Sequence, residues 1–368
     1  MSLGVMKLFA EYMGRIGRVA VVVEGVQSVE VLSVVGDTLE LRYVDASSPD
    51  QEWTSTQVRL PATVDLDSSR IAFTEQSSGK VRSFQLHLNA PKSSEPAGFN
   101  SADEECEKWS KSQLNKLRPF QLECDACKTV ILSSEDFPRL SDMPSEHWRE
   151  LMDYWHCHKP SVKDTPSEGA LYSSTYNHSL RPTATEILIG KAYFLVLPES
   201  INKCTISGTN LKCKGCGSQL GEVTSDNLYK LHKWRLVLRD DRGTCDTFSA
   251  MDDVLGSLVE YAREQSGRYL LVKCKGSTAQ QLLWLFNTHL GVTLPDGRIL
   301  TNAMKILVTA DEQAVRTART KHNVDEITVE EEPYNQCVHS LAERNGLLPS
   351  SLQIFGAWRV HYVKLFES

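Results

Sequence analysis

The sequence predicts a multidomain α+β protein with a β-rich N-terminal domain, a β domain clamped by paired cysteines, and an α/β C-terminal domain. Three observations lead to this prediction. Residues 14–90 consist of short apolar runs separated by turn residues, and two Cys-x-x-Cys motifs lie between strand-forming runs in the middle of the chain. From about Thr244, helical and strand patterns alternate. The expected domains are 1–105, 106–240 and 241–368.

The N-terminal domain is predicted to be a β-sandwich or an open barrel. Gly36-Asp37 separates two apolar runs and indicates a β-hairpin, and residues 71–88 contain the pattern of a second hairpin. Residues 90–105 are rich in Pro, Ser, Ala and acidic residues, which is typical of a linker. Because this part of the chain carries no catalytic motif, we expect it to be a scaffold or docking domain.

The two cysteine motifs of the middle domain are Cys124–Cys127 and Cys213–Cys216. A tight turn directs both thiolates of such a motif toward one metal ion, and zinc prefers four ligands in a tetrahedron. Two motifs therefore complete one structural Zn²⁺ site and predict a zinc-clamped β domain. The alternatives are a redox motif, which usually stands alone beside a βαβ unit, and pairs of buried thiols without a metal.

A helix is expected after the first motif, with Ser145 as its N-cap. Its apolar residues recur at i, i+3, i+4 and i+7 and predict one buried face, formed by Trp148, Leu151, Met152 and Trp155. At its end, Cys157 and His158 are potential metal ligands, for either motif or for a second zinc. Since the four cysteines already satisfy one zinc, the economical interpretation leaves both residues structural.

The remaining elements follow from local patterns. Tyr229 to Arg239 alternates like a strand, and Ser249 caps a helix that runs to about Gln265, with Asp252 in a capping-box position. We also expect a helix over Thr278 to Phe286. Further expected elements are strands over residues 186–197, 269–274, 303–309 and 358–365 and a helix over 333–344.

The composition narrows the function classes. A net charge of −7 and a pI of about 5.9 argue against direct nucleic-acid binding through a basic field. No apolar run reaches the length of a membrane span, so we expect no membrane partner. The N-terminus lacks a secretory pattern, and the 10 cysteines are then expected in a reducing compartment, either cytoplasm or nucleus.

The sequence offers one candidate catalytic nucleophile, Cys337. The sequence contains no P-loop, no His-Glu-x-x-His and no Gly-x-Ser-x-Gly motif. Cys337 has an imidazole nearby at His339, but positions i and i+2 of a helix point to different faces. We therefore expect Cys337 to be inert, and favour protein binding over chemistry.

Several segments together resemble one known family. Met143 to Trp148, Trp155 to His158, Cys213 to Gly221 and Tyr229 to Leu236 are similar to the HECT-like ubiquitin-conjugating-enzyme-binding proteins. The resemblance implies a ubiquitin ligase-like protein that accepts a charged conjugating enzyme as its partner. It also implies an alternative, a non-catalytic adaptor or chaperone that binds and stabilises the endonuclease of mRNA 3′-end cleavage and polyadenylation.

The chain departs from true HECT ligases at the nucleophile. Those enzymes carry a catalytic cysteine in a Thr-Cys context, whereas Gln336 precedes Cys337 here. Whether the protein is an enzyme is therefore open at the level of sequence. If it is a ligase, we expect it to bind the charged conjugating enzyme and orient its thioester.

Overall fold

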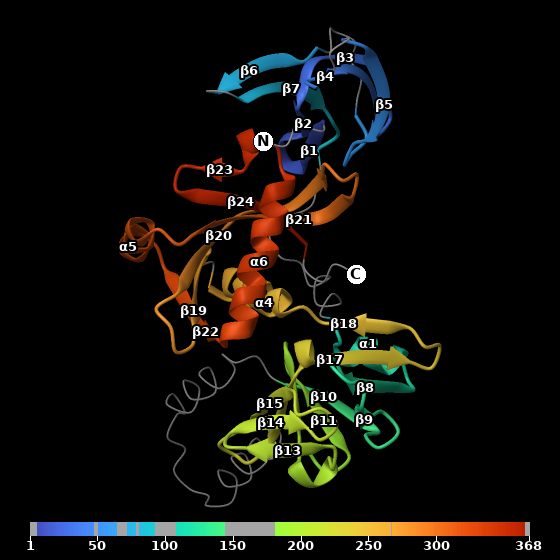
Figure 1. The fold of residues 1–368 in the computed structure, drawn as a ribbon, viewed down its shortest axis with the longest axis vertical. Coiled ribbons are helices and arrows are strands. Elements are labelled where there is room, and N and C mark those ends of the chain that lie inside the picture. The colour runs from blue at the N-terminus through green and yellow to red at the C-terminus, as the bar shows by residue number, and fades with distance from the viewer. Residues whose placement is uncertain are drawn as a thin grey trace, which may run out of the picture. The chain divides into compact units, whose positions relative to one another are not determined.

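The computed structural model describes residues 6–47, 51–64, 72–78, 81–92, 108–143, 181–265 and 267–364 (Figure 1). The chain forms two compact units, one of Met1–Asn100 with Val254–Ser368 and the other of Ser101–Asp253. This division differs from the three consecutive domains expected from the sequence, because the first and last parts of the chain share one unit. The helix expected from Ser145, including Cys157 and His158, lies outside the described residues.

A ten-stranded sheet is the centre of the first unit in the described part of the chain. Its order is β23-β24-β21-β20-β1-β2-β7-β6, and β19 pairs with both β20 and β22. Its strands are β1 (Lys7–Met13), β2 (Arg18–Glu24), β6 (Thr74–Ser78), β7 (Val81–Asn89), β19 (Tyr269–Cys274), β20 (Gln280–Thr293), β21 (Ile299–Thr309), β22 (Val324–Val329), β23 (Ile354–Phe355) and β24 (Trp358–Val363). The antiparallel pair of β1 and β20, with Glu11 opposite Val292, joins the N-terminal and C-terminal parts.

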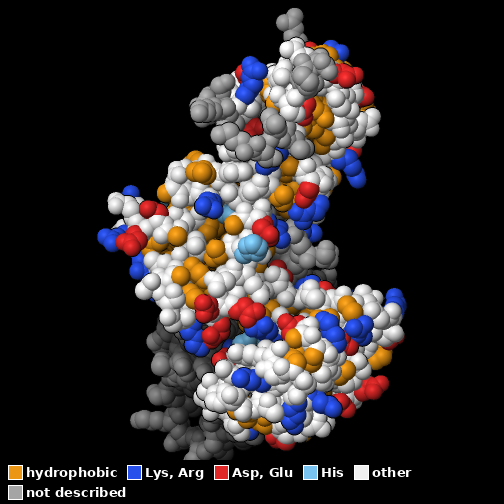
Figure 2. All heavy atoms as spheres, in the orientation of Figure 1, with side chains coloured by type: hydrophobic (Ala, Val, Ile, Leu, Met, Phe, Trp, Pro, Cys, Tyr) orange, Lys and Arg blue, Asp and Glu red, His pale blue; other side chains and the backbone are white. Residues whose placement is uncertain are grey.

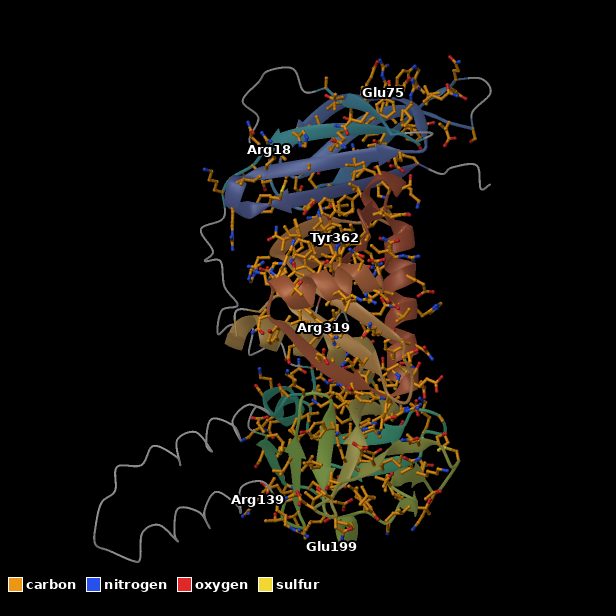
Figure 3. All side chains as sticks on the ribbon, turned by 90° about the vertical axis from the view of Figure 1, so that its left-hand side faces the viewer. Arg18, Glu75, Arg139, Glu199, Arg319 and Tyr362 are labelled. Atoms are coloured by element: carbon orange, nitrogen blue, oxygen red, sulfur yellow. The ribbon has the colours of Figure 1, made fainter. Side chains whose placement is uncertain are left out.

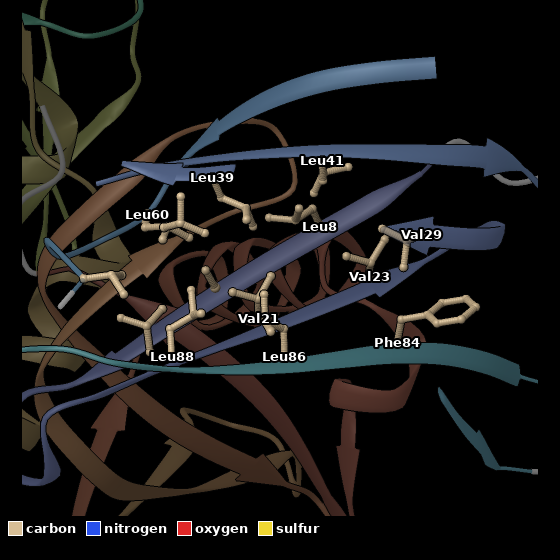
Figure 4. Packing of buried hydrophobic residues seen from close by; sticks show 14 of the residues in the cluster. Leu8, Val21, Val23, Val29, Leu39, Leu41, Leu60, Phe84, Leu86 and Leu88 are labelled. Carbon is tan, nitrogen blue, oxygen red and sulfur yellow. The ribbon is translucent and has the colours of Figure 1, made fainter. Parts of the chain in front are cut away.

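A smaller sheet packs beside β1, β2 and β7. It contains β3 (Val26–Val35), β4 (Thr38–Asp45) and β5 (Trp53–Arg59). The expected hairpin at Gly36-Asp37 is confirmed, since β3 and β4 pair and Gly36 has φ +60. The buried apolar side chains of both sheets form one core, which includes Val21, Leu39 and Leu86 (Figure 4).

Three helices belong to the C-terminal part: α4 (Ala250–Gln265), α5 (Glu312–Lys321) and α6 (Glu331–Leu347). The expected capping box of α4 is confirmed. The amide of Met251 donates to the Ser249 hydroxyl, and the amide of Ser249 donates to the Asp252 carboxylate. Helix α6 lies against β24 (Figure 1).

One expectation about this region is wrong. Thr278 to Phe286 is not a helix, because its residues from Gln280 onward belong to β20 and pair with β19 and β21. Adjacent leucines of β20 are buried on both faces of the sheet, so the strand has no alternating pattern. The Ser277 hydroxyl accepts from the amide of Ala279 in the preceding turn and caps no helix.

Residues 229–239 also differ from the expected single strand. They form β16 (Tyr229–His232) and β17 (Leu236–Asp240), separated by a 3-10 turn over Lys233–Arg235. The two strands belong to different sheets. Lys233 in this turn is buried, and its ammonium donates to the carbonyls of Lys108 and Trp109.

Two sheets form the second unit in its described residues. The seven-stranded sheet has the order β10-β11-β12-β16-β15-β14-β13, and the four-stranded sheet has the order β18-β17-β8-β9. Besides β16 and β17, the elements are α1 (Lys111–Lys116), β8 (Phe120–Cys124), β9 (Val130–Ser133), β10 (Arg139–Asp142), β11 (Glu186–Ile189), β12 (Tyr193–Val196), β13 (Cys204–Ser207), β14 (Asn210–Cys213), β15 (Gln219–Val223) and β18 (Cys245–Thr247).

Candidate metal centre

Each cysteine motif follows the end of a strand and has the same turn. The amide of Lys128 donates to the carbonyl of Cys124 at 2.9 Å, and the amide of Gly217 donates to the carbonyl of Cys213 at 2.8 Å. Both donors have a left-handed backbone, with φ +59 at Lys128 and +78 at Gly217. These two turns are the same structure formed twice, from β8 and from β14.

A hydroxyl supports the second sulfur of each motif. Thr129 Oγ1 lies 3.2 Å from Cys127 Sγ, and Ser218 Oγ lies 3.3 Å from Cys216 Sγ. Each hydroxyl comes two residues after its cysteine, at the same place in both turns. A hydroxyl at this distance can donate to a thiolate, and in the first turn it stabilises the charged form of Cys127.

The four sulfurs converge. All lie within 4.8 Å of one another, with 3.7 Å between Cys124 and Cys216 and 3.6 Å between Cys127 and Cys213. A tetrahedral zinc with Zn–S bonds of about 2.3 Å requires sulfurs about 3.8 Å apart. The cluster therefore has the donor set and the spacing of a Cys₄ zinc site, although the identity of a metal stays a prediction.

Gly215 leaves room for this cluster. A Cβ at this position would lie 2.7 Å from Thr129 Oγ1 and 3.4 Å from Cys127 Sγ. The amide of Gly215 also donates to Cys213 Sγ at 3.3 Å. The second motif thus needs glycine where the first has Ala126.

The two halves of the cluster have different environments. Cys124 and Cys213 are buried, whereas Cys127 and Cys216 are exposed. Hydrogen bonds from the Thr129 hydroxyl and amide lower the pKa of Cys127 to about 6, and burial raises the pKa of Cys124 to about 12. A bound cation would favour the thiolate at all four positions.

The cluster joins the two sheets of the second unit. Cys124 ends β8 of the four-stranded sheet and pairs with Leu236 of β17. Cys213 ends β14 of the seven-stranded sheet and pairs with Cys204 of β13. An ion held by these sulfurs would therefore fasten one sheet to the other, which is the role of a structural metal.

Cys337 lacks the surroundings of a catalytic nucleophile. Its side chain is 4% exposed on α6, whereas the imidazole of His339 is exposed and lies 3.2 Å from the Glu343 carboxylate. The buried thiol and the exposed imidazole therefore lie in different environments, as the helical spacing predicted.

Cys245 is a thiol that the sequence reasoning overlooked. It is exposed on β18 and lies opposite Arg239 of β17. Arg239 forms two hydrogen bonds to Glu123, at 2.8 and 3.1 Å. In the sequence, Cys245 directly follows the polar segment Asp240–Thr244, and this position could have indicated that its thiol is exposed.

The surface carries mixed charge. On the face shown in Figure 2, acidic and basic side chains are interspersed and do not gather into one basic patch. Of the helices that the structure describes, none combines the length and apolarity needed to cross a membrane.

The fold and the site define a β-rich, two-unit protein in which a four-cysteine cluster joins two sheets. The chain belongs to the HECT-like ubiquitin-conjugating enzyme (E2)-binding family, whose sequence model matches residues 11–360. This match confirms the resemblance noted in the sequence, and it spans both units.

Individual relatives agree with this assignment. The chain is 34% identical to protein YJR141W of Saccharomyces cerevisiae, over 96% of this chain and 98% of the yeast protein. It is 24% identical to an E3 ubiquitin-protein ligase of Rattus norvegicus, over 63% of this chain and 58% of the rat protein. The human ligase of the same name is 22% identical, over 66% of this chain and 72% of that protein. No solved structure matches the chain significantly.

Proposed function

We propose that this protein binds a ubiquitin-conjugating enzyme charged with ubiquitin and promotes ubiquitin transfer from it. The observation that carries the proposal is the family match over residues 11–360. The relatives named as ubiquitin ligases support the same role. The protein is thus proposed to be a ubiquitin ligase-like factor whose main partner is the conjugating enzyme.

Transfer is proposed to occur directly from the conjugating enzyme to the acceptor. A thioester relay needs a thiolate that the incoming thioester can reach. Cys337 is buried, as are Cys204 and Cys274, so these thiols are closed to a bulky thioester. Cys245 is exposed, so direct transfer also requires that this thiol carry no ubiquitin. The protein then acts by holding the charged enzyme in a reactive orientation, which contributes to the rate without a covalent step.

A zinc ion is proposed to hold the second unit together. Cys124, Cys127, Cys213 and Cys216 would bind it, and the ion would supply structural cross-linking between β8 and β14. The spacing of the sulfurs supports this assignment. The partner surface would then depend on zinc indirectly, through the fold.

The alternative is a non-catalytic adaptor that stabilises the endonuclease of mRNA 3′-end cleavage. The burial of Cys337 favours this alternative as well, because an adaptor needs no nucleophile. A net charge of −7 suits a basic patch on a protein partner. An adaptor of this kind would form its complex without ubiquitin and without RNA.

Binding distinguishes the two proposals. The purified chain is immobilised and presented with a panel of conjugating enzymes, each either free or charged with ubiquitin, and separately with the nuclease-treated endonuclease. We expect saturable binding of at least one conjugating enzyme. If the endonuclease binds while the whole panel of conjugating enzymes fails to bind, the adaptor replaces the ligase.

A further inference from the structure

A cavity of about 290 Å³ lies in the first unit, between α6 and the face of the sheet formed by β20, β21 and β24. It opens at the surface, because Ala342, Ala357 and Arg359 of its lining are exposed. Its volume is near the lower end of the range of about 300–1,000 Å³ for ligand pockets. Side chains from the helix and from all three strands line it, among them Gln281, Val308, Leu341, Ala342, Arg359 and His361. The cavity belongs to the first unit, and the four-cysteine cluster belongs to the second.

The alternation of β24 explains which residues face this cavity. Val360 and Tyr362 pack into the apolar cluster with Phe9 on one side of the sheet. Arg359 and His361 therefore point to the other side, toward α6, because successive side chains of a strand alternate. Both line the cavity.

His361 is an unpaired polar group in this buried position. Its side chain is 1% exposed, and neither ring nitrogen has a hydrogen-bond partner among the described residues. The carbonyl of Leu341 is close enough to raise the pKa of the ring, but does not form a hydrogen bond of normal geometry. A buried polar group without a partner costs folding free energy, so the unpaired ring points to a ligand that supplies the partner.

The charges around the imidazole favour an anion. Burial is the main cause that lowers the pKa of His361, and the positive charges of Arg359 and Arg344 lower it further. The Leu341 carbonyl raises it, and the resulting pKa is about 4. The ring is therefore neutral at pH 7 and offers one N–H donor and one acceptor. Arg359 forms no ion pair with any residue that the structure describes, so its guanidinium at the cavity is available to a negative group.

We propose that this cavity binds a small carboxylate on a short apolar stem, with the carboxylate accepting from Arg359 and from the ring N–H of His361. Residues i and i+2 of a strand lie about 7 Å apart, a span that one carboxylate bridges between two long side chains. The stem lies between Val308 of the sheet and Leu341 and Ala342 of α6.

A carboxylate fits better than a phosphate. Phosphate sites usually combine several cations or a row of backbone amides, whereas Arg359 is the cation that lines this cavity. The walls are mainly apolar, which suits a ligand with one charged end. The source of the carboxylate is either a free small acid or the end of a peptide chain. This proposal stands independently of any ubiquitin chemistry.

The test is a titration of the full chain carrying ¹⁵N-labelled histidine, followed by NMR of the ring nitrogens. His361→Gln assigns the resonance of His361. The probes are butyrate and N-acetyl-Gly-Gly, each compared with its uncharged amide. We expect saturable shifts of the His361 resonance with the acids and none with the amides.

Two variants and one control complete the design. Arg359→Gln removes the charge and should weaken binding of both acids by about tenfold or more. Ala342→Leu, at an exposed position of α6 that tolerates leucine, fills the cavity and should abolish binding. Arg316→Gln, on the exposed face of α5, is the matched control and should bind like the wild type.

Each outcome decides the proposal. Equal affinity for both acids identifies a free small acid, and tighter binding of the peptide identifies a chain end, so either result supports a carboxylate site. The proposal is overturned if neither acid gives a saturable shift, or if acids and amides bind alike. It is also overturned if folded Arg359→Gln keeps the affinity of the wild type.

Discussion

The phenol of Tyr362, which is labelled in Figure 3, donates a hydrogen bond to the carboxylate of Glu11. The distance between the two oxygens is 2.9 Å. This contact links β24, near the end of the chain, to β1, near its start. Lys305 of β21 approaches the same carboxylate at 3.5 Å. Burial, and then the charge of Glu11, raise the pKa of Tyr362 well above its ordinary value, so the hydroxyl stays protonated and donates.

Tyr362→Phe should therefore destabilise the first unit. The variant removes the donor and leaves part of a nearly buried carboxylate without its partner, which costs about 1–3 kcal/mol of the free energy of unfolding. Denaturant unfolding measures this change. Tyr12→Phe is the matched control, because Tyr12 makes an exposed hydrogen bond to Pro91, and its effect should be smaller. Equal effects of the two variants would contradict the role of the buried pair.

Glu24 should make stability depend on pH. Its carboxylate is 6% exposed and accepts from the amide and hydroxyl of Ser350 and the amide of Ser351. Burial raises its pKa, but the hydrogen bonds from Ser351 and Ser350 outweigh burial and lower the pKa below 4.5. A lowered folded pKa means that the stabilisation is complete above about 4.5 and is lost as the pH falls through the folded value.

The measurement compares wild type with Glu24→Gln across this range. At pH 7 the variant should be less stable by about 1–3 kcal/mol. The difference should shrink as the pH falls below about 4.5, because the unfolded chain then binds a proton at Glu24 before the folded chain does. A difference that stays constant down to pH 3 would show that Glu24 contributes no pH-dependent stability.

The four-cysteine cluster should contain one zinc per chain. Cys213→Ser should lose the metal and leave the second unit unfolded or aggregated, since structural zinc contributes about 10–16 kcal/mol to the folding of small zinc peptides. Cys204→Ser is the matched control, because Cys204 is buried opposite Cys213 but lies outside the cluster. Elemental analysis and circular dichroism report the result. A folded wild-type chain without zinc would overturn the assignment.

Gly215→Ala should weaken this site without removing a ligand. The new methyl group would lie 2.7 Å from Thr129 Oγ1, and such overpacking typically costs about 1–3 kcal/mol. Competition with a chelator should show weaker zinc binding. The control is Gly256→Ala in α4, where the new methyl meets open space and where alanine stabilises a helix. Unchanged zinc affinity in Gly215→Ala would contradict this prediction, because it would show that the turn accommodates the methyl group without weakening the site.

Local patterns predicted many elements of this protein. The turn at Gly36-Asp37 and the capping box of Ser249 and Asp252 depend on residues next to one another, and both are confirmed. The two cysteine motifs also predicted that the four thiols lie together, because two such motifs supply the four ligands of one tetrahedral metal site.

Other features depend on contacts far apart in sequence. The pairing of β1 with β20 is invisible in either strand alone, so the sequence suggested separate domains. The buried leucines of β20 lack alternation, which made a strand resemble a helix. The cavity at His361 arises only when α6 packs over β24, and no local pattern signals it.

Single-turnover discharge of a charged conjugating enzyme tests the central claim most directly. The conjugating enzyme that binds this chain is loaded with ubiquitin, mixed with free lysine, and followed on non-reducing gels with and without the chain. We predict that the chain accelerates discharge, that it carries no reducible ubiquitin adduct, and that Cys337→Ala and Cys245→Ser act like the wild type. A reducible adduct on the wild-type chain that disappears in either variant would contradict direct transfer and establish a thioester relay.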